Sequence, residues 1–365
     1  MPNFPLSIVS DASDAPSVPA DYDPNGVGSK SANLFGLPSN DENSRIIILP
    51  VPWEVTVSYG AGTAKGPAAI LDASTQLDLY DPEGVKIWEV GVFMPPISNV
   101  WQQRNDRLRQ QAADYIAALE ESENPLEEAK RWTTVIDNIN QASVELNAWL
   151  KAEALKYLSA GQFVGVIGGD HSSPLGLMQA LAQHHPEYSI LHIDAHADLR
   201  VAYEGFTFSH ASIMDNALNI PQISRIVQVG IRDLCPAEAE RIEQSNHRVV
   251  AFYDWELKSR QFTGQPWHQT CEEILAALSS KVYISFDIDG LDPSFCPHTG
   301  TPVPGGLRFE EAAYLLTQVA RSGKQIIGFD LCEVAPGEDD WDSNVGARIL
   351  YKLVSALAQS QHWVG

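Results

Sequence analysis

The stretch that decides the fold is Asp194-Ala195-His196-Ala197-Asp198, which directly follows the apolar run Ser189-Ile190-Leu191-His192-Ile193. The apolar run predicts a buried strand. In an extended backbone every second side chain points the same way, so Asp194, His196 and Asp198 are expected to share one face. Two carboxylates and an imidazole at a strand end are typical of a site for a divalent metal ion.

Two further apolar runs end in the same kinds of side chain. Residues 282–286 lead into Asp287-Ile288-Asp289, and residues 163–167 lead into Gly168-Gly169-Asp170-His171, where the paired glycines allow a tight turn. Ligands of open parallel sheets gather at the carboxyl ends of strands. Two imidazoles and four carboxylates are therefore expected in one place. They are too many for one tetrahedral ion but suit two ions that share bridging carboxylates.

The remaining pattern predicts the fold class. From residue 163 onward, apolar strand patterns alternate with amphipathic helical patterns, and a first strand is expected at residues 46–52. This alternation predicts an α/β fold in which helices cover both faces of a mostly parallel sheet. A TIM barrel has the same alternation and ranks second. A further strand is expected at 87–93, and a helix near 266–279.

The domain organisation follows from composition. Residues 1–44 are rich in Ser, Asp, Pro, Asn and Gly, which predicts an extended N-terminal arm with little regular structure, free to pack across a neighbouring subunit. Residues 45–365 are expected to form a single α/β domain. Within it, the segment 101–160 is expected to be helical, with a break at Asn124-Pro125 and a second helix from about 126 to 158.

Charge and cysteine usage narrow the class of function. The 365-residue chain has a formal net charge of −23, which argues against nucleic acid or anionic membranes as partners and favours a cationic substrate. The four cysteines are scattered and form no C-x-x-C pair, so a disulfide framework or a thiolate zinc site is not expected. With no leader and no membrane span in the pattern, a cytoplasmic protein is expected.

The three motifs around His171, Asp194 and Asp287 resemble those of the ureohydrolases, the family of arginases and agmatinases, and the resemblance extends over residues 46–360. It implies a three-layer α/β/α fold with a sheet of about eight strands, a binuclear metal centre, and hydrolysis of a guanidino group to urea and an amine. It also implies the ligands. One ion would be held by His171, Asp194, Asp198 and Asp287, and the other by His196, Asp194, Asp287 and Asp289, with Asp194 and Asp287 as bridges.

The resemblance also implies roles for residues outside the ligand set. Glu333, after the strand pattern at 326–331, matches the family's glutamate that binds the guanidinium group, and a carboxylate suits this task because it can accept two N–H groups in a fork. His210 matches the family's proton-shuttling histidine, and an imidazole titrates near neutral pH. Asp198 is expected to orient the attacking water, whose pKa two divalent ions would lower. Thr301 either lines the pocket or has a structural role in its loop.

Arg200 is the residue that bears on which substrate the protein uses. It stands where arginases carry a small polar residue. Arg200 disfavours arginine as the substrate. If it faces the pocket it would repel the distal ammonium of agmatine, or pair with a carboxylate tail as in guanidinobutyrate, guanidinopropionate or formiminoglutamate. It could also simply help to close the pocket. The long arm and the helical segment are similar to those of cyanobacterial-type guanidine hydrolases, which implies free guanidine as the substrate and two nickel ions per chain.

Several alternatives stay open at this point. The ligand set would bind manganese as well as nickel, so the metal rests on the resemblance alone. Agmatinase, guanidinobutyrase, guanidinopropionase and formiminoglutamate hydrolase remain alternative activities, and a catalytically silent binding protein is the alternative from another class. The resemblance further suggests a homotrimer or homohexamer. If the metal is nickel, accessory proteins that deliver nickel are expected as partners.

Overall fold

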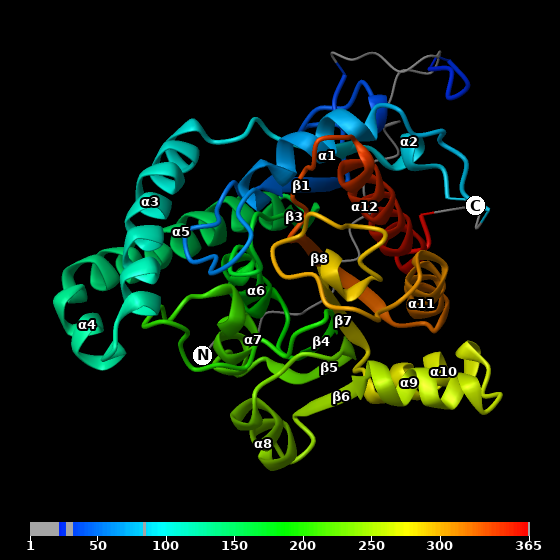
Figure 1. Cartoon of the computed structure of the whole chain (residues 1–365). Helices are drawn as coiled ribbons and strands as arrows, with labels where there is room; N and C mark the ends of the chain where they lie inside the picture. The colour runs from blue at the N-terminus through cyan, green and yellow to red at the C-terminus, as the bar shows by residue number, and fades with distance from the viewer. Residues whose placement is uncertain (1–21, 27–31, 83–84, 364–365) are drawn as a thin grey trace, which may run out of the picture.

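The computed structural model describes residues 22–26, 32–82 and 85–363. One parallel sheet lies at the centre of this part of the chain (Figure 1), with its strands in the order β2-β1-β3-β8-β7-β4-β5-β6. This confirms the predicted α/β fold with a mostly parallel sheet. The sheet is open, with β2 and β6 at its edges, so the fold is not a TIM barrel. The strands are β1 (Ile46–Pro50), β2 (Val92–Phe93), β3 (Phe163–Ile167), β4 (Tyr188–Ile193), β5 (Ile223–Ile231), β6 (Val249–Tyr253), β7 (Lys281–Asp287) and β8 (Gln325–Cys332).

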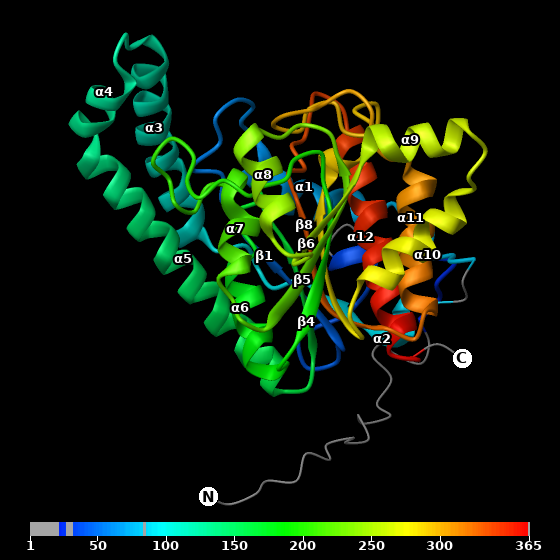
Figure 2. The same ribbon diagram turned by 90° about the horizontal axis from the view of Figure 1, so that it is seen from below.

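Helices cover both faces of the sheet, as Figure 2 shows edge-on. One face packs against α3, α5, α6 and α7, and the other against α1, α10, α11 and α12. The helices are α1 (Gly66–Ser74), α2 (Ile87–Val90), α3 (Asn99–Glu121), α4 (Pro125–Arg131), α5 (Thr133–Ser159), α6 (Leu175–His184), α7 (Ile213–Leu218), α8 (Pro236–Gln244), α9 (Asp254–Phe262), α10 (Trp267–Ala277), α11 (Phe309–Arg321) and α12 (Trp341–Ser360).

The two cores arise from the residue periodicity. Along β1, Ile46 and Ile48 belong to one buried cluster and Ile47 and Leu49 to the other, as the alternation of side chains in a strand requires. In α11, Ala312, Leu315, Leu316 and Val319 form one buried stripe at helical spacing. Each fully buried leucine or isoleucine contributes about 1.5–3 kcal/mol. The apolar pattern therefore positions the sheet, whose strand ends carry the polar residues.

Two expected elements differ from the structure, and one helix was not expected. The strand expected at 87–93 is instead α2 followed by β2, because Gly91, with φ +77°, ends the helical turn and redirects the chain. The break at Asn124-Pro125 is present, but the following helix is divided into α4 and α5 at Trp132, which has non-helical φ and ψ. The helix α9 was not expected, since its sequence is largely polar.

Part of the predicted arm lies on the body of its own chain. Leu34, Phe35 and Leu37 are buried, and the side chain of Asn33 both donates to the carbonyl of Met94 and accepts from its N–H. Residues 1–21 and 27–31 of the arm lie outside the described residues. Packing across a neighbouring subunit stays a prediction.

The helical segment supports the loop at residues 204–207, which follows β4. The hydroxyl of Tyr115 in α3 donates to the carbonyl of Glu204 at 3.0 Å, and the Asn140 amide in α5 accepts from Thr207 N–H at 2.9 Å and donates to the carbonyl of Gly205 at 3.1 Å. This loop precedes His210, so these helices contribute to the candidate site. In the part of the chain that the structure describes, no helix is long and apolar enough to cross a membrane.

Candidate metal centre

The predicted metal ligands and Glu333 lie at the carboxyl ends of four strands that are neighbours in the sheet, β3, β8, β7 and β4. His171 follows β3, Glu333 follows β8, and Asp287 is the last residue of β7. The turn after β3 depends on Gly169, because a Cβ atom there would lie only 2.0 Å from the carbonyl oxygen of Trp53. Without a side chain at residue 169, the turn can pack closely against the backbone of Trp53. His171 then points across the ends of β8 and β7.

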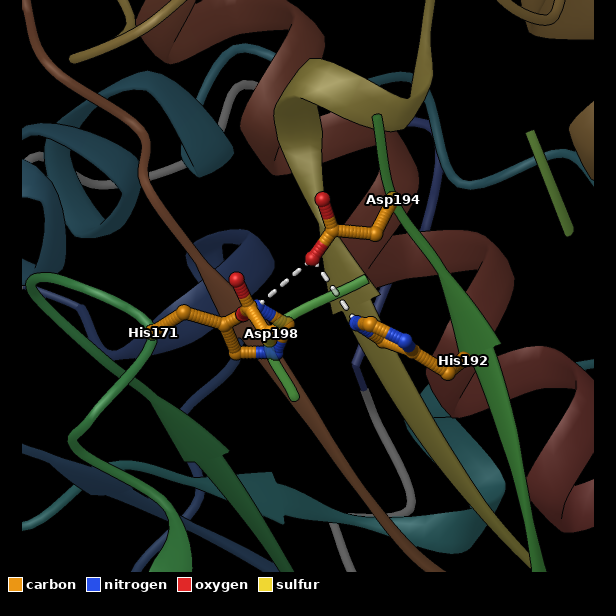
Figure 3. Close-up of side chains that lie close together, drawn as sticks. All are labelled: His171, His192, Asp194 and Asp198. Carbon is orange, nitrogen blue, oxygen red and sulfur yellow. Dashed lines mark hydrogen bonds and ion pairs between the residues drawn. The ribbon is translucent and has the colours of Figure 1, made fainter. Parts of the chain in front are cut away.

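His171 is the centre of a first group of ligands. Its Nδ1 lies 2.9 Å from Asp194 Oδ2, 3.2 Å from Asp198 Oδ2 and 3.2 Å from Asp287 Oδ2, and all four side chains are buried. Figure 3 shows Asp194 and Asp198 directed at the His171 ring. Three carboxylates and one imidazole around a common point form a donor set that suits a divalent ion.

A second group adjoins the first through a shared residue. His196 Nδ1 lies 3.0 Å from Asp289 Oδ2 and 3.5 Å from Asp194 Oδ1. Asp194 thus presents one carboxylate oxygen to each group, which is the arrangement that a bridging ligand requires. Asp287 contacts the first group with Oδ2, while its Oδ1 accepts from the Asp289 N–H at 2.9 Å.

Electrostatics fit the binding of cations here. Four buried carboxylates in one place repel one another unless positive charge neutralises them. Burial and the neighbouring Asp194 raise the pKa of Asp198 to about 6, and burial together with Asp289 raises the pKa of Asp287 well above its usual range. Burial opposes protonation of His171, but Asp194, Asp198 and Asp287 outweigh it and raise its pKa well above the ordinary value. These residues fit a pair of divalent ions by charge, donor type and position.

Two of the site residues have a left-handed backbone. Asp198 has φ +53° and Glu333 has φ +63°. Such conformations cost free energy in residues other than glycine, and strained backbone tends to cluster at functional sites. β4 ends at Ile193, so the strand does not continue through residues 194–198 as expected, and within them only His196 forms an isolated parallel bridge, with Asp233. An extended run would separate the backbones of Asp194 and Asp198 by roughly 13 Å. In the structure both carboxylates contact His171, and the chain has a left-handed φ at Asp198.

Glu333 has a carboxylate oxygen without a partner. Its Oε1 accepts from the His171 backbone N–H at 2.8 Å, whereas the buried Oε2 has no hydrogen-bond partner among the described residues. The loop residue Thr299 donates to the carbonyl of Glu333 at 2.8 Å. An unsatisfied buried acceptor costs about 1–3 kcal/mol, so Oε2 is suited to accept an N–H group from a ligand.

A small cavity of about 160 Å³ opens beside the metal-binding residues. Its lining brings together five of the predicted site residues, His196, Asp198, Arg200, His210 and Thr301, and also includes Tyr203 and Glu238. Burial and the neighbouring His196 and His171 cations lower the pKa of His210 to about 4, so its imidazole is neutral at pH 7. Glu333 is not among the lining residues; it lies buried next to His171.

Arg200 is held in place by two neighbours. Its guanidinium group lies 4.8 Å from the centre of the Tyr203 ring, and its Nε lies 3.8 Å from Oε2 of the buried Glu238. Glu238 is itself fixed, because it accepts from the backbone N–H groups of Leu199 and Cys235 at 3.0 and 2.9 Å. Arg200 therefore faces the cavity as a positioned charge.

Sequence reasoning missed three polar residues whose side chains contact the predicted ligands. His192 Nε2 lies 2.7 Å from Asp194 Oδ2, and the His171 Nε2 lies 2.9 Å from Ser285 Oγ and 3.6 Å from Asp330 Oδ1. His192 and Ser285 each stand two positions before a predicted ligand, on the same face of the strand. That spacing was a signal that could have identified them, whereas Asp330 is placed by strand pairing.

Comparisons with known proteins agree with this arrangement. Residues 44–356 match the model of the arginase family. The chain is 32% identical over 324 residues to the N(1)-aminopropylagmatine ureohydrolase of Thermus thermophilus, covering 88% of this chain and 94% of that protein. It is 30% identical over 325 residues to the protein of the same name from Synechocystis, covering 87% and 91% of the two chains.

A solved structure shows the same fold. The proclavaminate amidino hydrolase of Streptomyces clavuligerus superposes with a TM-score of 0.68 at 22% identity, covering 92% of this chain and 99% of that one. The family model, the relatives and the fold agree with the cluster of histidines and aspartates at the strand ends. The chain therefore belongs to the arginase family, the ureohydrolases that cleave a guanidino C–N bond at a binuclear divalent metal centre.

Proposed function

We propose that this protein hydrolyses free guanidine to urea and ammonia. The observation that carries the proposal is the size and charge of the cavity. Ligand sites of proteins commonly have volumes of roughly 300–1,000 Å³. This cavity has about 160 Å³, and Arg200 adds a fixed positive charge to its lining. A substrate without a tail fits the small volume, and the charge of Arg200 disfavours a substrate with a second, distal ammonium group.

The chain's own residues can support each step of this reaction. The bound ions would supply a water molecule of lowered pKa as the nucleophile. Glu333 would accept guanidinium N–H groups through its unpaired Oε2 and so hold the central carbon in place. Asp198, which lines the cavity, would accept a hydrogen bond from the attacking water.

Proton transfer completes the reaction. The oxygen of water forms a bond to the guanidinium carbon and one C–N bond breaks; one proton of the water converts the released ammonia to ammonium, and the other goes to the leaving nitrogen as the bond breaks. His210 is neutral at pH 7, lines the cavity and can carry this proton from water to the leaving nitrogen. Guanidinium and water thus give urea and ammonium, and the atoms and charges balance.

Longer substrates fit this cavity less well. Agmatine and aminopropylagmatine each carry a distal ammonium group, which Arg200 would repel. A carboxylate tail would have to compete with Glu238 for Arg200, because Glu238 already lies 3.8 Å from its Nε. The names of the relatives favour agmatine-type substrates as the second candidate.

The metal and the assembly belong to the proposal as well. We expect nickel in both positions, with manganese as the alternative, because imidazole and carboxylate ligands bind either ion. We expect a homotrimer or homohexamer, and accessory proteins that deliver nickel. The donor set supports two divalent ions without distinguishing between them.

The experiment is a substrate panel on metal-free protein reloaded with nickel or with manganese. Urea release is measured from guanidine, methylguanidine, agmatine, aminopropylagmatine, guanidinobutyrate and guanidinopropionate, and ammonia release from formiminoglutamate. The proposal expects the highest kcat/KM for guanidine with nickel. A tenfold advantage of agmatine or guanidinobutyrate would overturn it. Absence of both products with either metal would indicate a binding protein instead.

A further inference from the structure

His192 lies against the residue that the two groups of ligands share. It is fully buried on β4, two positions before Asp194, and its Nε2 lies 2.7 Å from Asp194 Oδ2. Figure 3 shows the His171 and His192 rings approaching the same oxygen of Asp194, and the centres of the two rings lie 5.2 Å apart. By distance alone His192 could be a further metal ligand, since its ligand atom lies close to those of His171, Asp194 and Asp198.

Gln228 decides which ring nitrogen of His192 carries the proton. It stands directly opposite His192 in the pairing of β5 with β4. Its Nε2 lies 2.7 Å from the carbonyl oxygen of Ala197 and 3.0 Å from His192 Nδ1. A backbone carbonyl only accepts, so the NH₂ group of the amide must face Ala197, and its second hydrogen points at His192.

The tautomer follows from this contact. His192 Nδ1 accepts from Gln228, so the neutral ring carries its proton on Nε2 and donates it to Asp194. A protonated Nε2 has no lone pair left for a metal ion. The reversed amide would place two oxygens against each other at Ala197. His192 is therefore a hydrogen-bond donor to Asp194 and not a ligand.

We propose that His192, fixed by Gln228, is a positioning residue that orients Asp194 between the two metal ions. A carboxylate oxygen has two lone pairs, so Asp194 Oδ2 can accept from His192 and still bind an ion. Because Asp194 presents Oδ1 to the His196 group and Oδ2 to the His171 group, its rotation would disturb both positions. Substitution of a residue that hydrogen-bonds to a metal ligand typically lowers metal affinity by about 10–100-fold.

The test is metal binding, which needs no substrate. Metal-free protein is titrated with Mn²⁺ and with Ni²⁺ by calorimetry, and retained metal is measured after dialysis. His192→Phe keeps a ring but removes the donor, and we expect affinity to fall about 10–100-fold. His192→Gln restores a donor near the Nε2 position and is expected to recover most of the loss. Gln228→Met removes the donor to His192 Nδ1, so the proton of the neutral ring is no longer held on Nε2. We expect a loss of metal affinity smaller than that of His192→Phe.

A matched control separates positioning from folding. Ser189→Ala removes a buried hydrogen-bonding side chain from the same strand, far along it from Asp194, where Ser189 Oγ accepts from the Ser279 N–H. We expect a lower melting temperature of the metal-free protein but unchanged metal affinity. For His192→Phe we expect the opposite pattern: a clear loss of metal affinity and only a small change in the melting temperature of the metal-free protein.

Two results would overturn the inference. The first is a His192→Phe protein that binds two ions with affinity within threefold of the unsubstituted protein. The second is a His192→Gln protein that loses as much affinity as His192→Phe. The inference rests on the proposed metal centre and not on guanidine as the substrate. If the unsubstituted protein failed to bind two ions per chain, the metal centre itself would be wrong, which is a distinct outcome.

Discussion

Arg200 and Glu238 form a partition between two cavities, with Arg200 Nε 3.8 Å from Glu238 Oε2. Among the described residues, these two line both the 160 Å³ cavity beside the metal-binding residues and a neighbouring surface groove of about 760 Å³. The groove lies between α8 and the loop at 199–202. On the proposed function, the Arg200–Glu238 pair would keep a substrate tail in the small cavity out of this groove.

Arg200→Ser is expected to shift the substrate preference. The change removes a positive charge and joins the two cavities. The ratio of kcat/KM for agmatine to that for guanidine should rise about tenfold, equivalent to about 1.4 kcal/mol. The measurement is urea release from both substrates. Arg241→Ser is the control, because Arg241 lines the groove but not the small cavity, and should leave the ratio unchanged. An unaltered ratio in Arg200→Ser would show that Arg200 does not set specificity.

His171→Ala and Asp289→Ala are expected to lose metal and activity together. Each removes a ligand from one of the two groups, and the remaining buried carboxylates are then poorly neutralised. We expect fewer than two ions per chain by elemental analysis, and a fall in kcat/KM of about 10³-fold. His185→Ala is the control, since His185 pairs with Lys281 elsewhere in the fold. Two ions retained per chain in either ligand variant would remove that residue from the assignment.

Glu333→Gln is expected to keep both ions but lose turnover. Glutamine has the same shape and can still accept from the His171 N–H, but it lacks the charge that pairs with guanidinium. We expect kcat/KM to fall by about 10²–10³-fold, the usual effect of removing one electrostatic contact to a reacting group. Metal content of the same sample is the control. Near-normal kcat/KM would exclude Glu333 from the mechanism.

The sequence predicted the sheet and the convergence of the site because both depend on local patterns. Apolar runs marked the strands, and parallel strands carry their polar ends to one edge. The backbone at Asp198 was not predictable, since this residue has a left-handed φ instead of the expected extended conformation. Its position after the strand was informative, but its backbone conformation was not.

The supporting contacts could not be predicted because they depend on strand order and register. Gln228 meets His192 only because β5 pairs with β4 in one particular register. Asp330 reaches His171 because β8 lies next to β3, although the two residues lie far apart in sequence. Glu238 was likewise not expected near Arg200, since α8 begins well after that loop.

Glu204 provides a pH-dependent prediction in the loop that leads to His210. Burial, together with the nearby Glu120, raises the pKa of Glu204 to about 7, against the lowering effects of Arg109 and Arg200, and its Oε2 has no partner among the described residues. In the unfolded chain the pKa is near 4.3. Below that pH the carboxyl is neutral in both states. As pH rises to 7 the unfolded state ionises first, so folding stability is lost over this range.

Glu204→Gln should therefore stabilise the protein at pH 8 and not at pH 4.5. The gain should grow between these values and reach about 1 kcal/mol, after allowance for solvent screening of a half-buried group. Urea unfolding of both proteins at pH 4.5, 6, 7 and 8 measures this difference. Glu123→Gln, at an exposed position, should show no such trend. A gain that was the same at every pH would mean that Glu204 ionises normally in the folded protein and that the substitution acts through packing alone.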